Sequence, residues 1–362
     1  MSDQAKPRKA RHAATLADVG REAGVSAMAA STVLNGARTS TRISDETRQR
    51  ILAAADKLQY RPNATARGLA ERRLNTIGLA TTLSGNELNQ YFLEVFNGVI
   101  EAAAAAGQNT TVFAMPDWQQ VGSRLPAICD GRIDGLILLA PLINPDDAAQ
   151  LPDHTPFVAI HANHAMPGVG NVASDEEAGA HAMVAHMLSL GHRRVLHLAG
   201  PNTSSGAQRR IDGFRRAHAE AGLTVNPGQI LHSDYSASSG RRVLTEWLER
   251  HRGQPMPEAI FAANDAVALG CIDILAGLGL RVPQDVSVVG FDDTLLARTT
   301  RLATVRQPLR DMGHQAVSLL MQAIEAKHRG QPARQATEVL LPTELVPGQT
   351  LSAPPADTVL IP

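Results

Sequence analysis

Residues 15–35 read Thr-Leu-Ala-Asp-Val-Gly-Arg-Glu-Ala-Gly-Val-Ser-Ala-Met-Ala-Ala-Ser-Thr-Val-Leu-Asn, and this stretch decides the fold of the first part of the chain. Thr15 and Asp18 have the spacing of an N-terminal capping pair, in which the carboxylate also favours the positive end of the helix. Gly24 ends this first helix, and Ser26 is placed to cap a second one. Two short helices around a tight glycine turn predict a helix-turn-helix, whose second helix enters the major groove of DNA.

The sequence that follows supplies a third helix and the rest of a small core. Ser44 is placed to cap a helix that runs to about Leu58. Without this third helix, a generic helical hairpin would be the simpler interpretation. The apolar positions of the first and third helices recur at helical spacing; they are Leu16, Val19 and Ala23, and then Ile51, Ala54, Ala55 and Leu58.

Charge is distributed unevenly along the 362 residues, a length that suits two or three domains. Residues 1–73 contain 14 Lys and Arg against 7 Asp and Glu, a net charge of +7, and the remainder carries −8. A basic head on an acidic body indicates a small DNA-binding module joined to a domain that does not bind DNA. A solvated basic tail over residues 6–11 would explain only part of the excess.

The two cysteines, Cys129 and Cys271, each lie in an apolar run and are expected to be buried free thiols in a reducing compartment. The N-terminus has charges but no apolar segment after them, so we expect no signal peptide. No run of 18 uncharged apolar residues occurs, so no membrane span is expected. The protein is therefore expected to be cytoplasmic and to act on the nucleoid.

From Asn75 onward, short apolar strands alternate with helices. Such strands are typical of parallel sheets covered on both faces, and two sets of them predict an α/β fold with two doubly wound subdomains. The expected strands cover 76–81, 110–114, 135–140 and 157–160, then 195–199, 229–232, 259–262 and 286–290. The expected helices cover 94–106, 176–190, 207–221, 237–251 and 266–278.

The last part of the chain departs from this alternation. A long helix over 309–327 precedes a strand-like segment over 336–345. The Pro-rich residues 349–362 are expected to be loose.

Several short sequence motifs in the first seventy residues match those of a known family. In their order and spacing they resemble the LacI/GalR (lactose-repressor) family of bacterial transcriptional regulators. The motifs are Leu16-Ala17-Asp18-Val19, Ala23-Gly24-Val25-Ser26, Val33-Leu34-Asn35-Gly36, Ser44-Asp45-Glu46-Thr47-Arg48 and Tyr60-Arg61-Pro62-Asn63.

The resemblance implies a helix-turn-helix DNA-binding domain followed by a periplasmic-binding-protein-like effector domain of two subdomains. The chain would cross three times between the subdomains. The implied partners are palindromic operator DNA, a small-molecule effector and a second copy of the chain, with a tetramer possible. The expected divisions are a basic flexible tail (1–13), the DNA-binding domain (14–61), a hinge helix (62–74), the effector and dimerisation domain (75–348, divided into 75–172 with 305–348, and 173–304) and a loose tail (349–362).

By the same resemblance, the start of the second helix reads the bases of the operator. Arg and Gln make the bidentate contacts that discriminate bases, whereas Ala27 and Met28 offer only apolar contacts, for instance to thymine methyls. Few side chains at this position can therefore discriminate bases by hydrogen bonds. Either the operator preference is relaxed, or it is set by other residues. The expected DNA-binding residues of this domain are Thr15, Leu16, Ala17, Ser26, Ala27, Met28, Ser31, Thr32 and Asn35.

Two further segments are expected to reach DNA. Arg38 and Arg42 lie in a loop where they either contact phosphates or are solvated charges. An isolated helix of about eight residues is unstable in water, so 63–70 is expected to become helical only when it is held. In the family, paired hinge helices insert a leucine into the minor groove and bend the DNA; the corresponding residues here are Asn63, Arg67 and Leu69.

The effector is expected in a cleft at the carboxyl ends of the strands of both subdomains. The family motif maps a ligand-contacting arginine to Arg210, whereas Arg209 is interpreted as a surface charge and Asp265 as either a ligand contact or a helix cap. A sugar or sugar derivative is the first expectation, and a nucleobase or other metabolite the second. The expected effector-binding residues are Thr82, Tyr91, Phe92, His161, Arg210, Tyr235, Asn264 and Asp292.

These patterns favour an effector-controlled repressor, with the effector either inducer or corepressor. A periplasmic-type sugar-binding protein shares the two-lobed fold but would need a secretion signal and no DNA-binding head. An enzyme is not expected, because the sequence has no GxGxxG after its early strands, P-loop, GxSxG or HExxH. No cofactor and no metal are expected.

Overall fold

The computed structural model describes residues 14–35, 43–61, 68, 73–82, 90–118, 121–331 and 338–362. The chain forms two compact units, residues 1–74 and 75–362. Within the described ranges, every helix is too short or too polar to cross a membrane.

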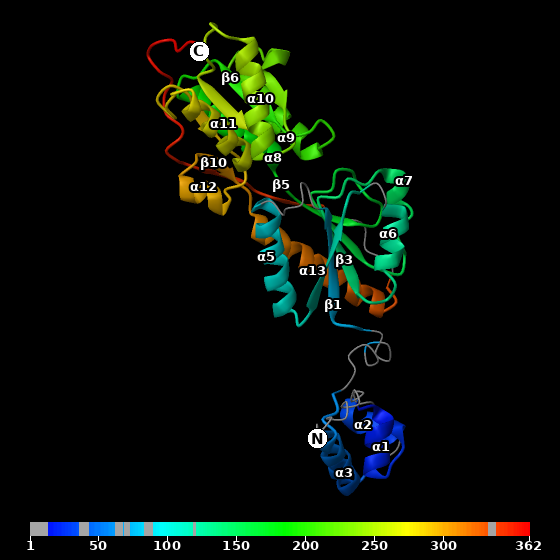
Figure 1. Cartoon of the computed structure of the whole chain (residues 1–362). Coiled ribbons are helices and arrows are strands. Elements are labelled where there is room, and N and C mark those ends of the chain that lie inside the picture. Colours follow the sequence, from blue (N-terminus) through cyan, green and yellow to red (C-terminus); the bar gives the residue numbers. More distant parts are fainter. Residues whose placement is uncertain are drawn as a thin grey trace, which may run out of the picture. The chain divides into compact units, whose positions relative to one another are not determined.

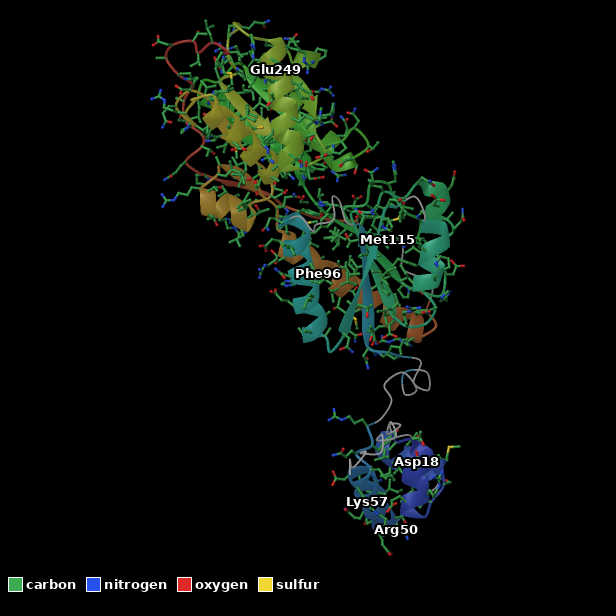
Figure 2. The ribbon with its side chains drawn as sticks, in the orientation of Figure 1. Asp18, Arg50, Lys57, Phe96, Met115 and Glu249 are labelled. Carbon is green, nitrogen blue, oxygen red and sulfur yellow. The ribbon has the colours of Figure 1, made fainter. Side chains whose placement is uncertain are left out.

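The first unit is a three-helix bundle of α1 (Leu16–Ala23), α2 (Ala27–Asn35) and α3 (Asp45–Lys57). The capping pair is confirmed: the Asp18 amide donates to Thr15 Oγ1, and the Thr15 amide donates to the Asp18 carboxylate at 3.0 Å. Gly24 ends α1 with φ +68°, in the left-handed region that suits glycine. Asp18 and Lys57 lie on the surface of this unit (Figure 2).

The bundle core contains the apolar residues that the helical spacing predicts. Val19, Ala23, Ile51, Ala54 and Ala55 are buried with Ala30, and Leu16 and Leu58 pack against them. The three helices therefore bury a shared core that no two of them would make alone.

The second unit contains two lobes, each built on a parallel sheet (Figure 1). The sheet of lobe 1 has the order β11-β5-β4-β3-β1-β2, and that of lobe 2 has the order β7-β6-β8-β9. The strands of lobe 1 are β1 (Thr76–Thr82), β2 (Asn109–Met115), β3 (Gly135–Leu139), β4 (Phe157–Ile160), β5 (Gly170–Ser174) and β11 (Glu338–Leu341). Those of lobe 2 are β6 (Val195–Ala199), β7 (Ile230–His232), β8 (Ala259–Ala262) and β9 (Ser287–Val289).

Helices cover both faces of each sheet, as the runs of apolar strand residues predict. In lobe 1, α5 (Gln90–Ala105) and α13 (Leu309–His328) lie on one side of the sheet, and α6 (Val121–Ile128) and α7 (Pro145–Ala148) on the other (Figure 1). In lobe 2, α8 (Glu176–Ser189) and α9 (Ser205–Glu220) share one core, and α10 (Ala237–Arg250) and α11 (Asp265–Gly277) share the opposite one.

Side chains alternate across the sheet of lobe 1. Ile137 and Leu139 face the α5 and α13 side, whereas Leu136 and Leu138 face the α6 side. This period of two is the geometry of a strand buried on both faces.

Three connections join the lobes. The first leads from β5 into α8; the second, β10 (Thr304–Arg306), leads from α12 (Leu295–Thr300) into α13; and the third is β12 (Glu344–Val346), after β11. Strands β10 and β12 pair antiparallel with each other. The expected single strand over 336–345 is therefore wrong: its described part breaks at Pro342-Thr343, and each half pairs with a different sheet.

The C-terminal tail is not loose. Ile361 is 3% exposed within the core of lobe 2, and the Met256 amide donates to Val359 O at 2.8 Å. We expected looseness from the prolines, but the apolar residues between them supply enough burial to hold the segment. Strand β5 is absent from the strands expected from sequence, because Gly170-Asn171 interrupts its apolar pattern.

Candidate functional site

The second helix of the bundle exposes an apolar surface at its start. Met28 is 77% exposed and Ala27 is also exposed. Ser26 caps the helix, since its Oγ accepts the Ala29 amide at 3.1 Å. The Thr32 hydroxyl donates to Met28 O at 3.0 Å. The side chains free to meet a groove at this end are therefore mainly apolar.

The other expected DNA-binding residues lie in different settings. Thr15 and Ala17 are exposed, Ser31 is half-buried, and Leu16 packs on the bundle core. Asn35 ends α2. Arg38, Arg42, Asn63, Arg67 and Leu69 lie outside the described residues.

The second unit holds a cavity of about 600 Å³ between its lobes. All eight expected effector-binding residues line it, although they come from segments up to 210 residues apart. Lobe 1 contributes Thr82, Tyr91, Phe92 and His161, and lobe 2 contributes Arg210, Tyr235, Asn264 and Asp292. Tyr91 and Phe92 belong to the first turn of α5 rather than to a loop. That these residues bind a ligand stays a prediction.

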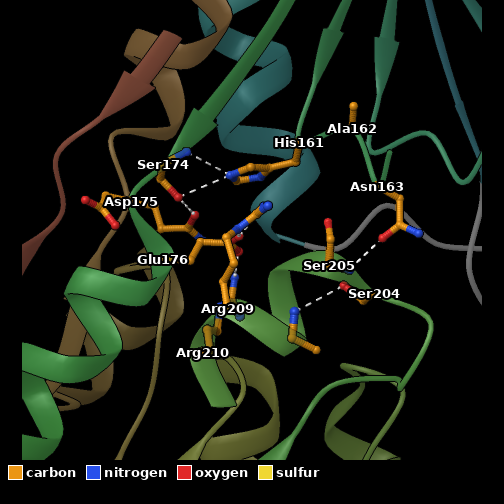
Figure 3. A network of polar contacts seen from close by, with 12 residues as sticks. His161, Ala162, Asn163, Ser174, Asp175, Glu176, Ser204, Ser205, Arg209 and Arg210 are labelled. Carbon is orange, nitrogen blue, oxygen red and sulfur yellow. Dashed lines mark hydrogen bonds and ion pairs between the residues drawn. The ribbon is translucent and has the colours of Figure 1, made fainter. Parts of the chain in front are cut away.

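A buried carboxylate holds two arginines at the centre of the lobe 2 wall (Figure 3). Glu176, only 2% exposed, pairs with Arg210 Nη2 at 2.8 Å and with Arg209 Nη2 at 2.6 Å. Burial alone would raise the pKa of Glu176, but the charges of Arg210 and Arg209 outweigh this effect and hold the pKa at about 2. Glu176 is therefore ionised at neutral pH.

Arg210 is fixed from several sides. Its Nη1 donates to Ala263 O, and its guanidinium lies 4.1 Å from the centre of the Phe291 ring. Burial opposes the charge of Arg210, yet Glu176 raises the pKa above its usual value, so the guanidinium stays protonated. Its buried Nε has no hydrogen-bond partner among the described residues, so one donor of this side chain is unsatisfied.

A chain of hydrogen bonds connects the two walls of the cavity. The Ser174 amide donates to His161 Nε2 at 3.0 Å, so His161 Nδ1 carries the proton and donates to Tyr91 Oη at 2.6 Å. Ser174 Oγ donates to Gln307 Oε1, and Gln307 Nε2 donates to Asp292 Oδ1 at 2.6 Å. Ser174 and Gln307 belong to two of the connections between the lobes, so this chain follows the path along which the lobes are joined.

Burial shifts the pKa values of His161 and Asp292 in the direction that favours their neutral forms. Burial lowers the pKa of His161 to about 4, against the opposing effect of Glu176. Burial likewise raises the pKa of Asp292 well above its usual value, although Arg210 counteracts it. The wall around these two side chains therefore offers hydrogen-bonding groups more than charge.

Backbone strain is concentrated at the cavity. Ala140, His161, Tyr235 and Asp292 all have positive φ, at +49°, +51°, +69° and +120°. Each follows a strand at the carboxyl edge of its sheet, and each lines the cavity. Non-glycine residues in this region are unfavourable and cluster at functional sites.

Two neighbouring polar residues have roles that sequence alone left open. Asn264, not Asp265, caps α11, since its Oδ1 accepts the Val267 amide at 2.9 Å. Asp265 is 1% exposed and instead accepts from Thr304 Oγ1 at 2.6 Å and from Thr294. The interpretation of Asp265 as a cap is therefore wrong, because Asn264 occupies that position.

Among the lining residues that sequence missed or misread, three carry the charge or the aromatic surface of the site. Arg209 is not a free surface charge, because its Nε and Nη2 both bind Glu176 Oε2. Glu176 follows the strand β5 that the sequence pattern did not reveal, and Trp118 follows β2. The end of a recognised strand was the usable signal in the case of Trp118. In the described part of the chain, no three His, Cys, Asp or Glu side chains gather closely enough to hold a metal ion.

Comparison with known families gives two matches that follow the division of the chain. A family described as "Bacterial regulatory proteins, lacI family" matches residues 15–63, and a "Periplasmic binding protein-like domain" matches residues 184–351. The chain is 32% identical to the HTH-type transcriptional repressor PurR of Photobacterium profundum, over 87% of this chain and 93% of the relative. It is 30% identical to the HTH-type transcriptional regulator DegA of Bacillus subtilis, over 92% and 96%.

Solved structures resemble the whole chain. A lac repressor dimer bound to operator and the anti-inducer ONPF matches with a TM-score of 0.79 and 28% identity, over 94% of this chain and all of the other. A complex of the transcriptional regulator CelR with cellobiose matches with a TM-score of 0.68 and 26% identity, over 93% of this chain and all of the other.

Proposed function

Because this chain belongs to the LacI family of bacterial transcriptional regulators, we propose that it represses transcription as a homodimer on palindromic operator DNA under the control of a ligand in the interlobe cavity. The observation that carries the proposal is the cavity of about 600 Å³, which gathers strand-end residues from both lobes. A ligand held by both lobes has different contacts whenever the lobes move, and only such a difference can shift an equilibrium.

The composition of the cavity favours a hydroxylated ring as the ligand. Lobe 1 supplies the aromatic side chains of Tyr91, Phe92 and Trp118, and lobe 2 supplies amide, hydroxyl and guanidinium groups. Aromatic faces with a few convergent polar groups suit a sugar, and the CelR structure contains cellobiose. A nucleobase is the second candidate, because a flat polar ring meets the same wall.

For the first unit, we assign DNA recognition to the start of α2. Ala27 and Met28 are the exposed side chains there, so apolar contact with thymine methyls is the expected base readout. Arg21, whose side chain is 78% exposed, pairs with Asp18 on the surface and is within reach of solvent for exchange to a phosphate. Affinity for DNA should therefore fall steeply with salt. This activity requires no chemical turnover, and we place it in the cytoplasm.

The test begins with selection of an operator from random duplexes by the purified full chain. Operator affinity is then measured by fluorescence anisotropy with and without sugars and nucleobases that raise the melting temperature. We expect a ligand that stabilises the protein to change operator affinity at least tenfold and to remain chemically unaltered. Stabilising ligands that leave operator affinity unchanged would contradict the control mechanism, and selection that enriches no sequence would contradict the assignment of a specific operator.

A further inference from the structure

The wall of lobe 2 has the components of an anion site. Two arginines point to one place, and the N-terminus of the 16-residue helix α9 opens onto the same cavity through Ser204, Ser205 and Gly206. Guanidinium groups and a helix N-terminus together favour a phosphate or a carboxylate. Taken by themselves, these elements would select a phosphorylated or acidic effector.

The protein fills this place with a carboxylate of its own. Glu176 Oε2 accepts from Arg209 Nε at 2.8 Å, and Glu176 Oε1 accepts from Arg210 Nη2 at 2.8 Å (Figure 3). A Cβ placed on Gly206 would lie 2.6 Å from Glu176 Oε1, so the glycine makes room for the carboxylate against the first turn of α9. Both oxygens of Glu176 thus occupy the position that an external anion would need.

Two amides at the start of α9 are also taken by neutral acceptors. Asn163, from lobe 1, accepts the Ser205 amide through Oδ1 at 2.5 Å. Ser204 Oγ accepts the Ala207 amide at 3.3 Å. The Nε of Arg210 is buried and has no hydrogen-bond partner among the described residues, whereas its Nη atoms are taken by Glu176 and Ala263 O.

Both arginines of the lining are therefore paired before any ligand enters. A further carboxylate of the lining, Asp234, accepts hydrogen bonds from Ser236 and adds negative charge to the same wall. An incoming phosphate would add negative charge beside the buried Glu176, at a separation where the repulsion is weakly screened.

We infer that Glu176 is a built-in anion that makes the cavity select uncharged hydroxylated ligands and reject phosphorylated or carboxylated ones. The inference rests on the proposed function only in taking this cavity as the ligand site. It predicts that removing one charge, without changing shape, converts the cavity into an oxyanion site.

The test uses inorganic phosphate as the probe and Trp118 as the reporter. The chain has two tryptophans, and Trp247 stacks on His251 in lobe 2, outside the cavity lining. In a full-length Trp247→Phe protein, fluorescence reports Trp118 alone. Phosphate is titrated at constant ionic strength into this parent and into its Glu176→Gln, Glu176→Asp and Glu177→Gln variants.

Glu177→Gln is the matched control. Glu177 is the next residue on α8, has a side chain that is 41% exposed, and pairs with Arg216 outside the cavity. Its substitution changes net charge by the same amount as Glu176→Gln.

We expect Glu176→Gln to bind phosphate at least tenfold more tightly than the parent, with a saturable change in Trp118 fluorescence. Glu176→Asp and Glu177→Gln should behave like the parent. Saturable millimolar phosphate binding by the parent, reported by Trp118, would overturn the inference whether or not Glu176→Gln folds. So would a folded Glu176→Gln protein that gains no affinity.

A second arm separates this inference from the proposed function. Ribose is compared with ribose 5-phosphate, and glucose with glucose 6-phosphate, for binding and for effect on operator affinity. Tighter binding of either phosphate ester than of its neutral sugar overturns the inference but leaves effector control intact. Neutral sugars that bind at Trp118 without altering operator affinity support the inference and contradict the proposed control.

Discussion

The two walls of the cavity come from lobes with the same parallel-sheet plan, yet they handle polarity in different ways. The lobe 1 wall is aromatic and uncharged, with Tyr91, Phe92 and Trp118 beside a neutral His161. The lobe 2 wall is charged but internally paired, with Glu176 between Arg209 and Arg210. Lobe 2 therefore offsets the cost of burying its charges by pairing them with each other. Lobe 1 supplies an aromatic surface on which a ring can stack.

The difference indicates which wall contributes both to the stability of the fold and to ligand recognition. On lobe 2, the residues that face a ligand also satisfy buried charges, so changes there should affect folding. On lobe 1, the contacts are weaker hydrogen bonds and apolar faces, so changes there should affect folding less. The predictions below test that ranking, beginning with the largest effect.

Arg210→Met should lower the free energy of unfolding by up to about 3–5 kcal/mol, because it leaves the buried Glu176 with only the partly exposed Arg209 as its counter-charge. The double variant Glu176→Gln/Arg210→Met should recover much of this loss. The control is Arg216→Met, which breaks the exposed pair with Glu177 on the same two helices and should cost less than about 1 kcal/mol. Urea unfolding measures all three variants, and equal costs for Arg210→Met and Arg216→Met would contradict the assigned difference.

The buried His197 should make the free energy of unfolding depend on pH under acidic conditions. Burial lowers the pKa of His197 to about 4, despite a hydrogen bond to Phe261 O. Because the unfolded chain takes up the proton near pH 6.5 and the folded protein resists it, this stability is present above pH 6.5. It is lost as the pH falls towards 4, by up to about 3 kcal/mol for this one side chain.

His197→Phe should flatten the dependence of unfolding free energy on pH between 6.5 and 4. The lobe 1 residue His161, whose pKa is also lowered to about 4, should produce a similar change when replaced by Phe. Unfolding by urea at a series of pH values measures both slopes. An unchanged slope in His197→Phe would show that His197 does not carry the acid sensitivity of lobe 2.

Gly206→Ala tests the room made for the carboxylate. The added methyl would lie 2.6 Å from Glu176 Oε1, so the variant should be less stable by about 1–3 kcal/mol. Gly277→Ala, in α11 with open space around its Cα, is the control and should be neutral or stabilising by up to about 1 kcal/mol. If both variants were equally stable, Glu176 would have to be free to move away from α9.

Tyr91→Phe should have the smallest effect, about 1 kcal/mol, because it removes one hydrogen bond between Tyr91 and His161 on the lobe 1 wall. Chemical denaturation checks the size. A cost as large as that of Arg210→Met would reverse the proposed ranking of the two lobes.

Sequence predicted much of the fold because the relevant signals are local. The capping pair Thr15–Asp18, the glycine at 24 and the apolar periods placed three helices and most strands within a few residues of their observed bounds. It failed where a pattern was interrupted or a partner was remote. Strand β5 was missed at Gly170-Asn171, and the tail was expected to be loose because Ile361 finds its core only in the folded lobe.

The candidate site was predicted in its members but not in its connections. The positions of strand ends, together with the family resemblance that pointed to Arg210, Tyr235, Asn264 and Asp292, identified eight residues that line one cavity. The role of Arg209 was misread, since nothing near residue 209 reveals a carboxylate 33 positions earlier. Asp265 was misread as a possible cap for the same reason, because Thr304 lies 39 residues away.

The sequence by itself determined the helix-turn-helix and the two alternating strand–helix sets, because caps, turns and periodicity act within a few residues. The candidate cavity residues came from strand ends together with the family resemblance. Only the tertiary structure decided how charge is arranged in the cavity. Glu176 contacts two arginines and lies at the start of α9 only because β5 pairs in its sheet and α8 packs on α9. Electrostatic energy depends on distance in space, so no local pattern records it.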